Sequence, residues 1–509
     1  MSDEAAISAG VPARYTPVAN KALLTTLVVL ATLMQGLDAT IANVALPHIQ
    51  SSLSATQDQI AWILTSYIVA AAVMYPLTGW LANSFGRRKV FLISIALFVA
   101  ASALCGAATS LPQMVAFRLL QGIGGAALVP LSQAIMLDIN LPKDYGRAMA
   151  LFGVGATMGP ILGPVLGGWL TDSYSWRWCF YINLPVGLLT FIGLYLTLPA
   201  THNRRPTQFD FFGFASLSVA VAALQLMLDR GQLLDWFSSR EIVIEAVTAG
   251  LSFYFFLVHT FSTDTPFVDP ALFRNRNFLV ANLFLFQAGI TLFATLALHP
   301  LLLQGRLHYP VMLAGLVIAP RGFGSIVGMV IAGRLVSRID PRLIMAVGLS
   351  LTAYSLWQMT HYSLLMESWP VVTAGIVQGL GIGTVNVCLS TVAFVTLPPV
   401  YRNEGAAISN LVRSIGGAMG ISVMVFLLTQ NTARMHAALG EHVTPFNMAA
   451  NPAASAAHVD VLTTRGLLAL DSLVTNQSAM VAYIDDFRLM MILTLLTIPF
   501  LLLFERPRS

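Results

Sequence analysis

Long apolar segments recur along almost the whole chain and are separated by short polar connections. A helix that crosses a bilayer needs about 20 mostly apolar residues. Fourteen segments meet this requirement. They lie at 22–46, 59–82, 89–109, 112–139, 146–171, 178–198, 210–229, 241–261, 277–304, 311–336, 342–361, 368–397, 403–430 and 486–504. The pattern predicts an all-α integral membrane protein with 14 transmembrane helices.

Composition supports this prediction, because 56% of the residues are hydrophobic, only 10% are charged and the mean hydropathy is +0.75. Soluble domains carry about 25% charged residues, so the chain has little room for a soluble domain. Cys105, Cys179 and Cys388 are an odd number of cysteines in or near apolar segments. We therefore expect free core thiols and no disulfide framework.

The distribution of positive charge predicts the orientation. An even number of spans places both termini on one side of the membrane. With a cytoplasmic N-terminus, most of the 27 Lys and Arg residues fall on the inside, including Lys21, Lys89 and Lys143. The positive-inside rule therefore predicts that both termini are cytoplasmic. Residues 1–20 lack the pattern of a cleaved secretory signal and are expected to form a cytoplasmic tail.

Several classes of catalytic site are absent from the sequence. None of the three lysines follows a glycine, as a phosphate-binding P-loop requires. There is no G-x-S-x-G nucleophile motif, and the histidines and cysteines lack zinc-like spacing. We therefore expect that the chain is not an enzyme and that it uses no cofactor and no metal. Uphill transport would need an ion gradient.

Similar motifs at corresponding positions of the chain predict two related halves. "GWLANSFGRRK" at 79–89 joins the second and third spans, and "GRLVSRIDPR" at 333–342 lies at the corresponding later turn. "FRLLQGIGGA" at 117–126 is echoed by "GIVQGLGIGT" at 375–384. Repeated bundles of this kind place the substrate path between the halves. The predicted divisions are a tail (1–20), a six-helix bundle (21–200), two inserted helices (201–265), a second six-helix bundle (266–505) with an external loop at 431–485, and a tail (506–509).

A glycine stripe marks the fifth span. Gly155, Gly159, Gly163 and Gly167 fall four residues apart in "GATMGPILGPVLGG". Such a stripe lets helix backbones approach closely in a membrane. Pro160 and Pro164 lie between these glycines and remove backbone donors, which bends a helix. The pattern is compatible with a gating role or with tight static packing.

Two ionisable residues are candidates for proton coupling. Asp38 is the carboxylate farthest from either end of its span, and Arg118 lies at a comparable depth in the fourth span. Charges within a bilayer are costly and are functional candidates by default. A neighbouring Arg favours the charged carboxylate, whereas burial favours the protonated form. The alternative is a permanent structural ion pair.

Other polar residues within spans are candidates for lining a substrate cavity. Arg321 and Arg413 could each meet an anionic substrate group, or could cap a broken helix or pair with carbonyls. The amide candidates are Gln35, Asn43, Gln121, Gln287, Gln378 and Asn386. Amides also serve as ordinary glue between membrane helices.

Taken together, these motifs resemble the major facilitator superfamily, in particular its 14-helix drug:proton antiporters of the EmrB type. The resemblance rests on "LDATIANVALP" at 37–47, the loop motif with Gly79, Gly86, Arg87 and Arg88, Arg118 with Gln121 and Gly122, the doubled Gly-Pro stripe, and "WRWCFYINLPVG" at 176–187. The loop has Asn83 where the superfamily usually has Asp. We therefore assign no latch between the halves to this position.

The resemblance implies a function and partners. It implies proton-driven export of hydrophobic or amphipathic drugs by alternating access, with gating by the fifth-span glycines. It also implies a bacterial inner membrane, a periplasmic adaptor of the EmrA type and an outer-membrane channel of the TolC type. The external loop, helix-like at its end, is the candidate adaptor site, unless it is a mobile loop. The alternative functions are narrow export of a metabolite or fatty acid and, against the buried Asp38 and Arg118, a non-transporting scaffold or sensor.

Overall fold

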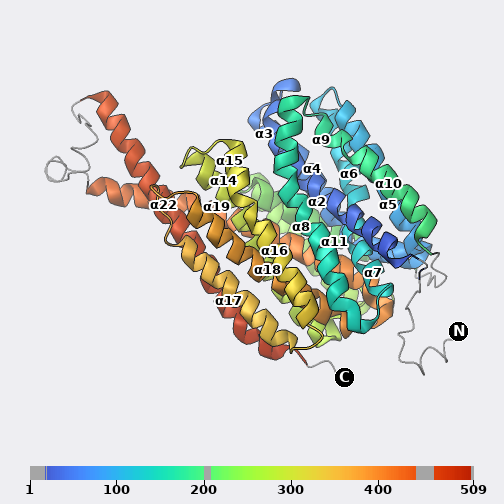
Figure 1. The fold of residues 1–509 in the computed structure, drawn as a ribbon. Helices are drawn as coiled ribbons and strands as arrows, with labels where there is room; N and C mark the ends of the chain where they lie inside the picture. Colours follow the sequence, from blue (N-terminus) through green and yellow to red (C-terminus); the bar gives the residue numbers. More distant parts are fainter. Residues whose placement is uncertain (1–17, 19, 200–207, 443–462, 506–509) are drawn as a thin grey trace, which may run out of the picture.

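The computed structural model describes residues 18, 20–199, 208–442 and 463–505, and these residues form helices without a β-strand (Figure 1). Thirteen helical segments in this part of the chain are long and apolar enough to cross a membrane. The remaining predicted span, 342–361, forms the 19-residue helix Pro341–Met359 (α17). Each of the fourteen predicted spans therefore coincides with one helix or with consecutive helices, and the predicted fold class is confirmed.

The first bundle comprises the helices before the inserted pair. They are α2 (Lys21–Ser52), α3 (Gln57–Ile60), α4 (Trp62–Phe85), α5 (Arg87–Ala107), α6 (Leu111–Gly125), α7 (Leu128–Asp138), η1 (Pro142–Asp144), α8 (Tyr145–Ser173), α9 (Trp178–Tyr181) and α10 (Asn183–Thr197). The fourth span consists of α6 and α7, and the sixth consists of α9 and α10. Cys105, Cys179 and Cys388 are free and buried, as expected.

The inserted pair and the second bundle follow. The inserted segment contains α11 (Phe211–Arg230), η2 (Trp236–Ser238) and α12 (Arg240–Ser262). The second bundle contains α13 (Ala271–Arg274), α14 (Arg276–Gly305), α15 (Val311–Ile318), α16 (Pro320–Leu335), α17, α18 (Trp369–Val395), η3 (Pro399–Tyr401), α19 (Arg402–Glu441), α22 (Thr464–Thr497) and η4 (Ile498–Leu503). Both bundles match the predicted order, and the division into domains stays a prediction.

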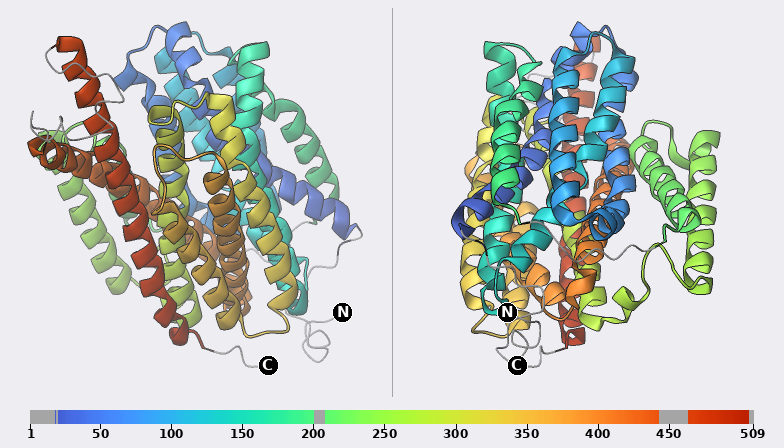
Figure 2. Two further views of the ribbon diagram at one scale, coloured as in Figure 1. Left: turned by 60° about the vertical axis from the view of Figure 1, so that its left-hand side comes forward. Right: turned by 90° about the vertical axis from the view of Figure 1, so that its right-hand side faces the viewer.

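The two bundles lie side by side, and the inserted pair stands on one flank, light green in the right-hand view of Figure 2. The start of α2 and the end of η4 lie at one end of the molecule, which we call the terminal end. We call the opposite end the far end. The bundles meet where α8 packs against α16 and where α19 packs against α4. These contacts frame the space between the bundles.

The predicted external loop differs from expectation. α19 continues to Glu441, and α22 begins at Thr464, so much of 431–485 is helical and extends from the far end (Figure 1, upper left). The end of the loop, which was expected to be helix-like, is helical and continuous with the last span. The physical reason is that residues 464–485 contain no proline to stop the helix. Residues 443–462 lie outside the described residues.

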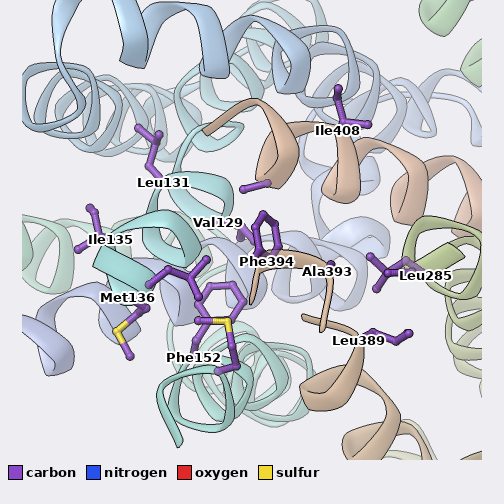
Figure 3. Packing of buried hydrophobic residues seen from close by; sticks show 14 of the residues in the cluster. Val129, Leu131, Ile135, Met136, Phe152, Leu285, Leu389, Ala393, Phe394 and Ile408 are labelled. Atoms are coloured by element: carbon purple, nitrogen blue, oxygen red, sulfur yellow. The ribbon is translucent and has the colours of Figure 1, made fainter. Parts of the chain in front are cut away.

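A hydrophobic cluster joins the bundles toward the terminal end. Val129 and Phe152 of the first bundle and Leu389 and Phe394 of the second belong to one buried cluster (Figure 3). Phe394 is 1% exposed. Burying such side chains contributes about 1.5–3 kcal/mol each, although less where the alternative is lipid. The cluster forms an apolar floor beneath the space between the bundles.

Candidate functional site

A cavity of about 680 Å³ lies between the two bundles. Met149 and Phe152 line it near the apolar floor, and Asn43, Gly315 and Val425 line it toward the far end. Its wall comes from α2, α4, α6, α7, α8, α11, α14, α15, α16, α18 and α19. The lining combines aliphatic and aromatic residues with a few polar groups, as ligand pockets commonly do.

The predicted pair of Asp38 and Arg118 forms next to this cavity. Arg118 Nη1 donates to Asp38 Oδ2 at 2.8 Å, and the side chains are 1% and 0% exposed. Gln121 Nε2 and Asn183 Nδ2 donate to Asp38 Oδ1 at 2.8 and 2.9 Å. Three donors thus converge on the carboxyl group, a set that suits a carboxylate because it accepts hydrogen bonds only.

Arg118 connects this pair to the cavity, because it lines the cavity whereas Asp38 lies behind it. Its guanidinium carbon lies 4.2 Å from the ring centroid of Tyr67, and its Nε donates to the Ile63 carbonyl at 3.2 Å. Gln35 Nε2 donates to the Tyr67 hydroxyl at 3.3 Å. The cavity surface and the buried carboxylate are therefore connected through Arg118 and Tyr67.

The glycines of "FRLLQGIGGA" explain how the pair assembles. A Cβ on Gly122 would lie 2.5 Å from the Tyr67 carbonyl oxygen, and one on Gly124 would lie 2.7 Å from the Phe98 nitrogen. Both contacts are too close for a side chain, so these glycines let α6 pack directly on α4 and α5. This close approach brings Arg118 against Tyr67.

Five of the eight predicted cavity residues line the cavity: Gln35, Asn43, Asn386, Arg321 and Arg413. The prediction was wrong for Gln121, Gln287 and Gln378. Gln121 is fully buried on Asp38 and Arg118. Gln287 donates to Thr291 and Thr494 within the second bundle, at 2.9 and 3.1 Å. Gln378 is fully buried, and its amide has no hydrogen-bond partner.

Gln378 also shows where the internal echo ends. It aligns with Gln121 in the echoed motifs, but Gly375 stands where the first bundle has Arg118. The glycines of the second motif instead pack on the α16 backbone, as Gly383 does on Ser325. Gln121 and Gln378 both lie on the packed side of their helix. The sequence alone does not show which side of a helix faces the cavity.

Arg321 and Arg413 bring positive charge into the cavity wall. Neither forms an ion pair with a described acidic residue. Arg413 Nη2 donates to Asn410 Oδ1 at 2.8 Å. Arg321 Nη2 donates to the Leu292 carbonyl at 3.3 Å, while its Nη1 is buried without a hydrogen-bond partner. Both side chains therefore keep charge that an anionic group in the cavity could neutralise.

All four glycines of the stripe face α2 in the same bundle. A Cβ on Gly155 would lie 2.6 Å from Val29 Cγ1, one on Gly159 would lie 2.6 Å from the Leu37 nitrogen, and one on Gly167 would lie 2.9 Å from Ile41 Cγ1. Gly163 packs on Thr40. α8 remains one helix across Pro160 and Pro164, and Pro160 lines the cavity. The stripe therefore sets the approach of α8 to the helix that carries Asp38.

A buried polar cluster, which we call the terminal cluster, joins the bundles at the terminal end. Asp138 accepts hydrogen bonds from Arg87 and, at 2.8 Å, from Arg402 Nη1. Arg402 Nη2 also donates to the Tyr145 hydroxyl at 2.7 Å. Arg87 Nε donates to Asn403 Oδ1 at 2.9 Å. Because Arg402 and Asn403 start α19 of the second bundle, these bonds hold that end closed.

The loop motif contributes to this closure through Asn83, a position to which the sequence alone assigned no latch. Asn83 Nδ2 donates to Glu404 Oε1 at 3.1 Å, and Asn403 Nδ2 donates to Asn83 Oδ1 at 2.7 Å. An amide both donates and accepts, so it can join a carboxyl and an amide without adding a charge. A Cβ on Gly79 would lie 2.9 Å from Glu404 Cα.

The remaining members of the motif form the turn. Gly86 has φ of 90°, in a region that favours glycine. Arg88 Nη2 donates to the Tyr195 carbonyl at 2.6 Å and takes no part in the terminal cluster.

Sequence reasoning missed several polar partners. Asn183 was part of the quoted sixth-span motif, but its bond to Asp38 depends on the packing of α10 against α2. Asp138 stands at the end of the predicted fourth span, and Arg402 adjoins the thirteenth. Their position as charged residues at span ends was the one feature of the sequence that could have indicated the terminal cluster. Asp229 and Gln225 of the inserted helix α11 also line the cavity. Nothing in the local pattern places an inserted helix there.

The chain is similar to two multidrug export proteins and to a fatty acid resistance protein. It is 36% identical to Multidrug export protein EmrB of Haemophilus influenzae over 438 residues, covering 85% of this chain and 86% of the relative. It is 36% identical to Multidrug export protein EmrB of Escherichia coli over 431 residues, covering 84% and 83%. It is 34% identical to Fatty acid resistance protein FarB of Neisseria gonorrhoeae over 502 residues, covering 97% and 98%.

Solved structures and the family model agree with these similarities. The human organic anion transporter MFSD10 (TETRAN) has a similar fold, with a TM-score of 0.60 at 18% identity over 93% of this chain and 99% of its own. The proton:xylose symporter XylE has a TM-score of 0.60 at 14% identity over 94% and 95%. The model of the Major Facilitator Superfamily matches residues 28–421. The chain therefore belongs to the major facilitator superfamily of membrane transporters and lies among its EmrB-like members.

Proposed function

We propose that this protein exports hydrophobic and amphipathic compounds by alternating access and that proton movement drives the export. The observation that carries the proposal is the buried pair of Asp38 and Arg118 beside a cavity between two bundles. A carboxyl group can carry a proton, and Arg118 reaches both that group and the cavity. The names of the relatives, multidrug export and fatty acid resistance, support export of apolar compounds.

The contacts between the bundles support a rocking mechanism. The terminal cluster and the apolar floor close one end, while the cavity extends toward the other. In the proposed cycle, the terminal cluster breaks when the cavity opens to that end. Protonation of Asp38 would neutralise the carboxylate that holds Arg118 and would free the guanidinium to change its contacts. This charge change is the proposed link between proton binding and rearrangement.

Transport into inside-out vesicles tests the proposed function. With the proposed cytoplasmic termini, the terminal end of the inserted protein faces the medium in such vesicles. We expect uptake of fluorescent amphipathic compounds under an imposed pH gradient, acidic inside, and loss of uptake when the gradient is collapsed. Vesicles without the protein are the control. Uptake that is unaffected by collapsing the gradient would overturn proton coupling, and absence of uptake for every compound would overturn export.

The cavity charge favours amphipathic anions as a second candidate substrate class. Arg118 is paired with Asp38, whereas Arg321 and Arg413 have no described acidic partner. A carboxylate group in the cavity could pair with the positive charge of Arg321 or Arg413, which both line it. This chemistry suits a fatty-acid-like molecule, and the vesicle panel therefore includes a fluorescent fatty acid beside cationic and neutral compounds.

We also propose that the helical extension of α19 and α22 binds a periplasmic adaptor of the EmrA type, which leads to a TolC-type channel. This assigns the far end to the periplasm and the protein to a bacterial inner membrane. The extension carries Arg434, Glu441, Arg465 and Asp471, as a segment in water would. His436 Nε2 and Asp471 Oδ1 are 3.1 Å apart and link the two helices. The extension is therefore a projecting helical pair.

Exposed leucines on this extension provide a test of adaptor binding. Leu467 and Leu468 of α22 are 53% and 66% exposed. We expect Leu467→Glu with Leu468→Glu to reduce capture of the adaptor by about tenfold or more, because interface anchors contribute about 2 kcal/mol or more. Pull-down from detergent with purified adaptor measures this. Ser472→Glu, on the same exposed helix segment, is the control for added charge. Unchanged capture by the leucine variant would exclude this surface.

A further inference from the structure

The inserted helix α11 reaches the central cavity as well as the flank of the molecule. Its residues Gln225, Leu228 and Asp229 line the cavity, as does Gln232 just beyond its end. α11 packs here against α4 and α19, which also line the cavity. Helix α11 of the inserted pair therefore contributes to the surface that a substrate meets.

The end of α11 is bonded to both bundles. Thr65 Oγ1 on α4 donates to Asp229 Oδ2. Ser422 Oγ on α19 donates to the Leu228 carbonyl at 2.8 Å, and Gln232 Nε2 donates to Thr429 Oγ1 at 3.3 Å. The rings of Trp236 and Phe426 lie 5.5 Å apart. These contacts place Asp229 at the far mouth of the cavity, close to the start of α4.

Asp229 differs in charge from the rest of the lining. It is the sole acidic side chain among the described residues that line the cavity, whereas Arg118, Arg321 and Arg413 are basic. It is exposed, and it forms no ion pair with any described Lys, Arg or His. The adjacent Arg230 pairs instead with Glu241 and lies 5.1 Å from the ring centroid of Trp62. The Asp229 carboxylate is therefore left to face the cavity.

We propose that Asp229 is a substrate-binding residue that receives the cationic group of amphipathic substrates at the far mouth of the cavity. The proposal rests on the proposed export function and deepens it. A carboxylate at the mouth and guanidinium groups deeper in the wall give one cavity two poles of opposite charge. Compounds with a positive group then bind through Asp229, and anionic compounds bind without it. The inserted helix α11 thus takes part in substrate selection.

Equilibrium binding and transport of charged probes test this inference. Asp229→Asn removes the charge, but its amide oxygen still accepts the bond from Thr65. We expect affinity for tetraphenylphosphonium, measured on detergent-solubilised full-length protein, to fall at least about fivefold, as loss of a charge contact in a partly hydrated site implies. Export of ethidium in vesicles should fall to a similar extent. Export of a fluorescent fatty acid should stay within about twofold of the unmodified protein.

Two further variants separate charge from structure. Asp229→Glu keeps a carboxylate at this position and should therefore bind the cation, unlike Asp229→Asn. Asp235→Asn removes an exposed carboxylate that does not line the cavity, at a left-handed φ of 54° that Asn tolerates, and it should bind the cation normally. Equal cation binding by Asp229→Asn and the unmodified protein would overturn the inference, as would absence of cation binding in the unmodified protein. Equal loss of all probes would assign Asp229 to structure. In contrast, failure of every probe in the unmodified protein would overturn export itself.

Discussion

Asp38→Asn is expected to abolish export driven by a pH gradient while leaving the protein folded. The substitution keeps the size of the side chain and one acceptor oxygen but removes the group that exchanges a proton. Export of every substrate against its gradient should fall to the level of vesicles without the protein. Substrate binding should persist, because Asp38 lies behind the cavity wall. The deciding measurement is proton release when substrate is added to detergent-solubilised protein.

Arg118→Ala is the companion variant. It leaves the Asp38 carboxyl with two donors, Gln121 and Asn183, but without its charged partner. We expect slowed export with substrate-dependent proton exchange still detectable. Breaking a buried ion pair costs about 3–5 kcal/mol of stability, so the amount of folded protein must be measured in parallel.

A permanent structural ion pair predicts a different pattern. Each single substitution would then reduce transport only by reducing stability, and Asp38→Asn combined with Arg118→Ala would recover stability by removing the unpaired charge. Transport per folded molecule would stay unchanged in all three variants. Proton release equal in Asp38→Asn and the unmodified protein would rule out Asp38 as the proton carrier.

Gly163→Leu is expected to cut transport strongly without removing the protein from the membrane. Any side chain at Gly163 would overlap Thr40 on α2. The overlap is with a neighbouring helix, so α8 itself could still form. Overpacking of this kind costs about 1–3 kcal/mol or more. If α8 and α2 must keep this close approach while the bundles rearrange, transport per folded molecule should fall roughly tenfold or more.

Gly168 supplies a matched control on the same helix. A Cβ at Gly168 would have Val44 Cγ1 as its nearest neighbour at 4.0 Å, an ordinary contact distance, so Gly168→Leu adds the same side chain without the overlap at Cβ. It should insert and transport normally. Comparison of thermal stability with transport per folded molecule separates the two interpretations of the stripe. Full transport by well-folded Gly163→Leu would leave only the packing interpretation.

How much of the fold the sequence could predict depended on whether a feature leaves an apolar pattern in the chain. Helices in a bilayer must satisfy their backbone hydrogen bonds internally and expose apolar side chains to lipid. Both requirements are local, so each predicted span coincides with one helix or with consecutive helices of the structure. The far ends of α19 and α22 were different, because in water a helix can continue without an apolar pattern. The local signal for the membrane therefore ended before the helices did.

The same distinction applies to the residues of the candidate site. Asp38 and Arg118 were evident from sequence because a charge in the middle of an apolar span is costly and therefore rare. Amide side chains in a span are less informative, because they can either form hydrogen bonds within a bundle or line the cavity. Packing alone decided that Gln35 and Asn43 face the cavity while Gln287 and Gln378 do not.

The sequence by itself determined the membrane-spanning helices, the repeated bundles and the buried charge, because each rests on polarity along the chain. Tertiary structure alone decided which distant residues meet. It brought Asn183 to Asp38, Asp138 to Arg402 and Asp229 to the cavity mouth. The physical reason is that these meetings depend on how whole helices are rotated and displaced against each other, and close glycine contacts such as Gly159 on α2 fix that arrangement.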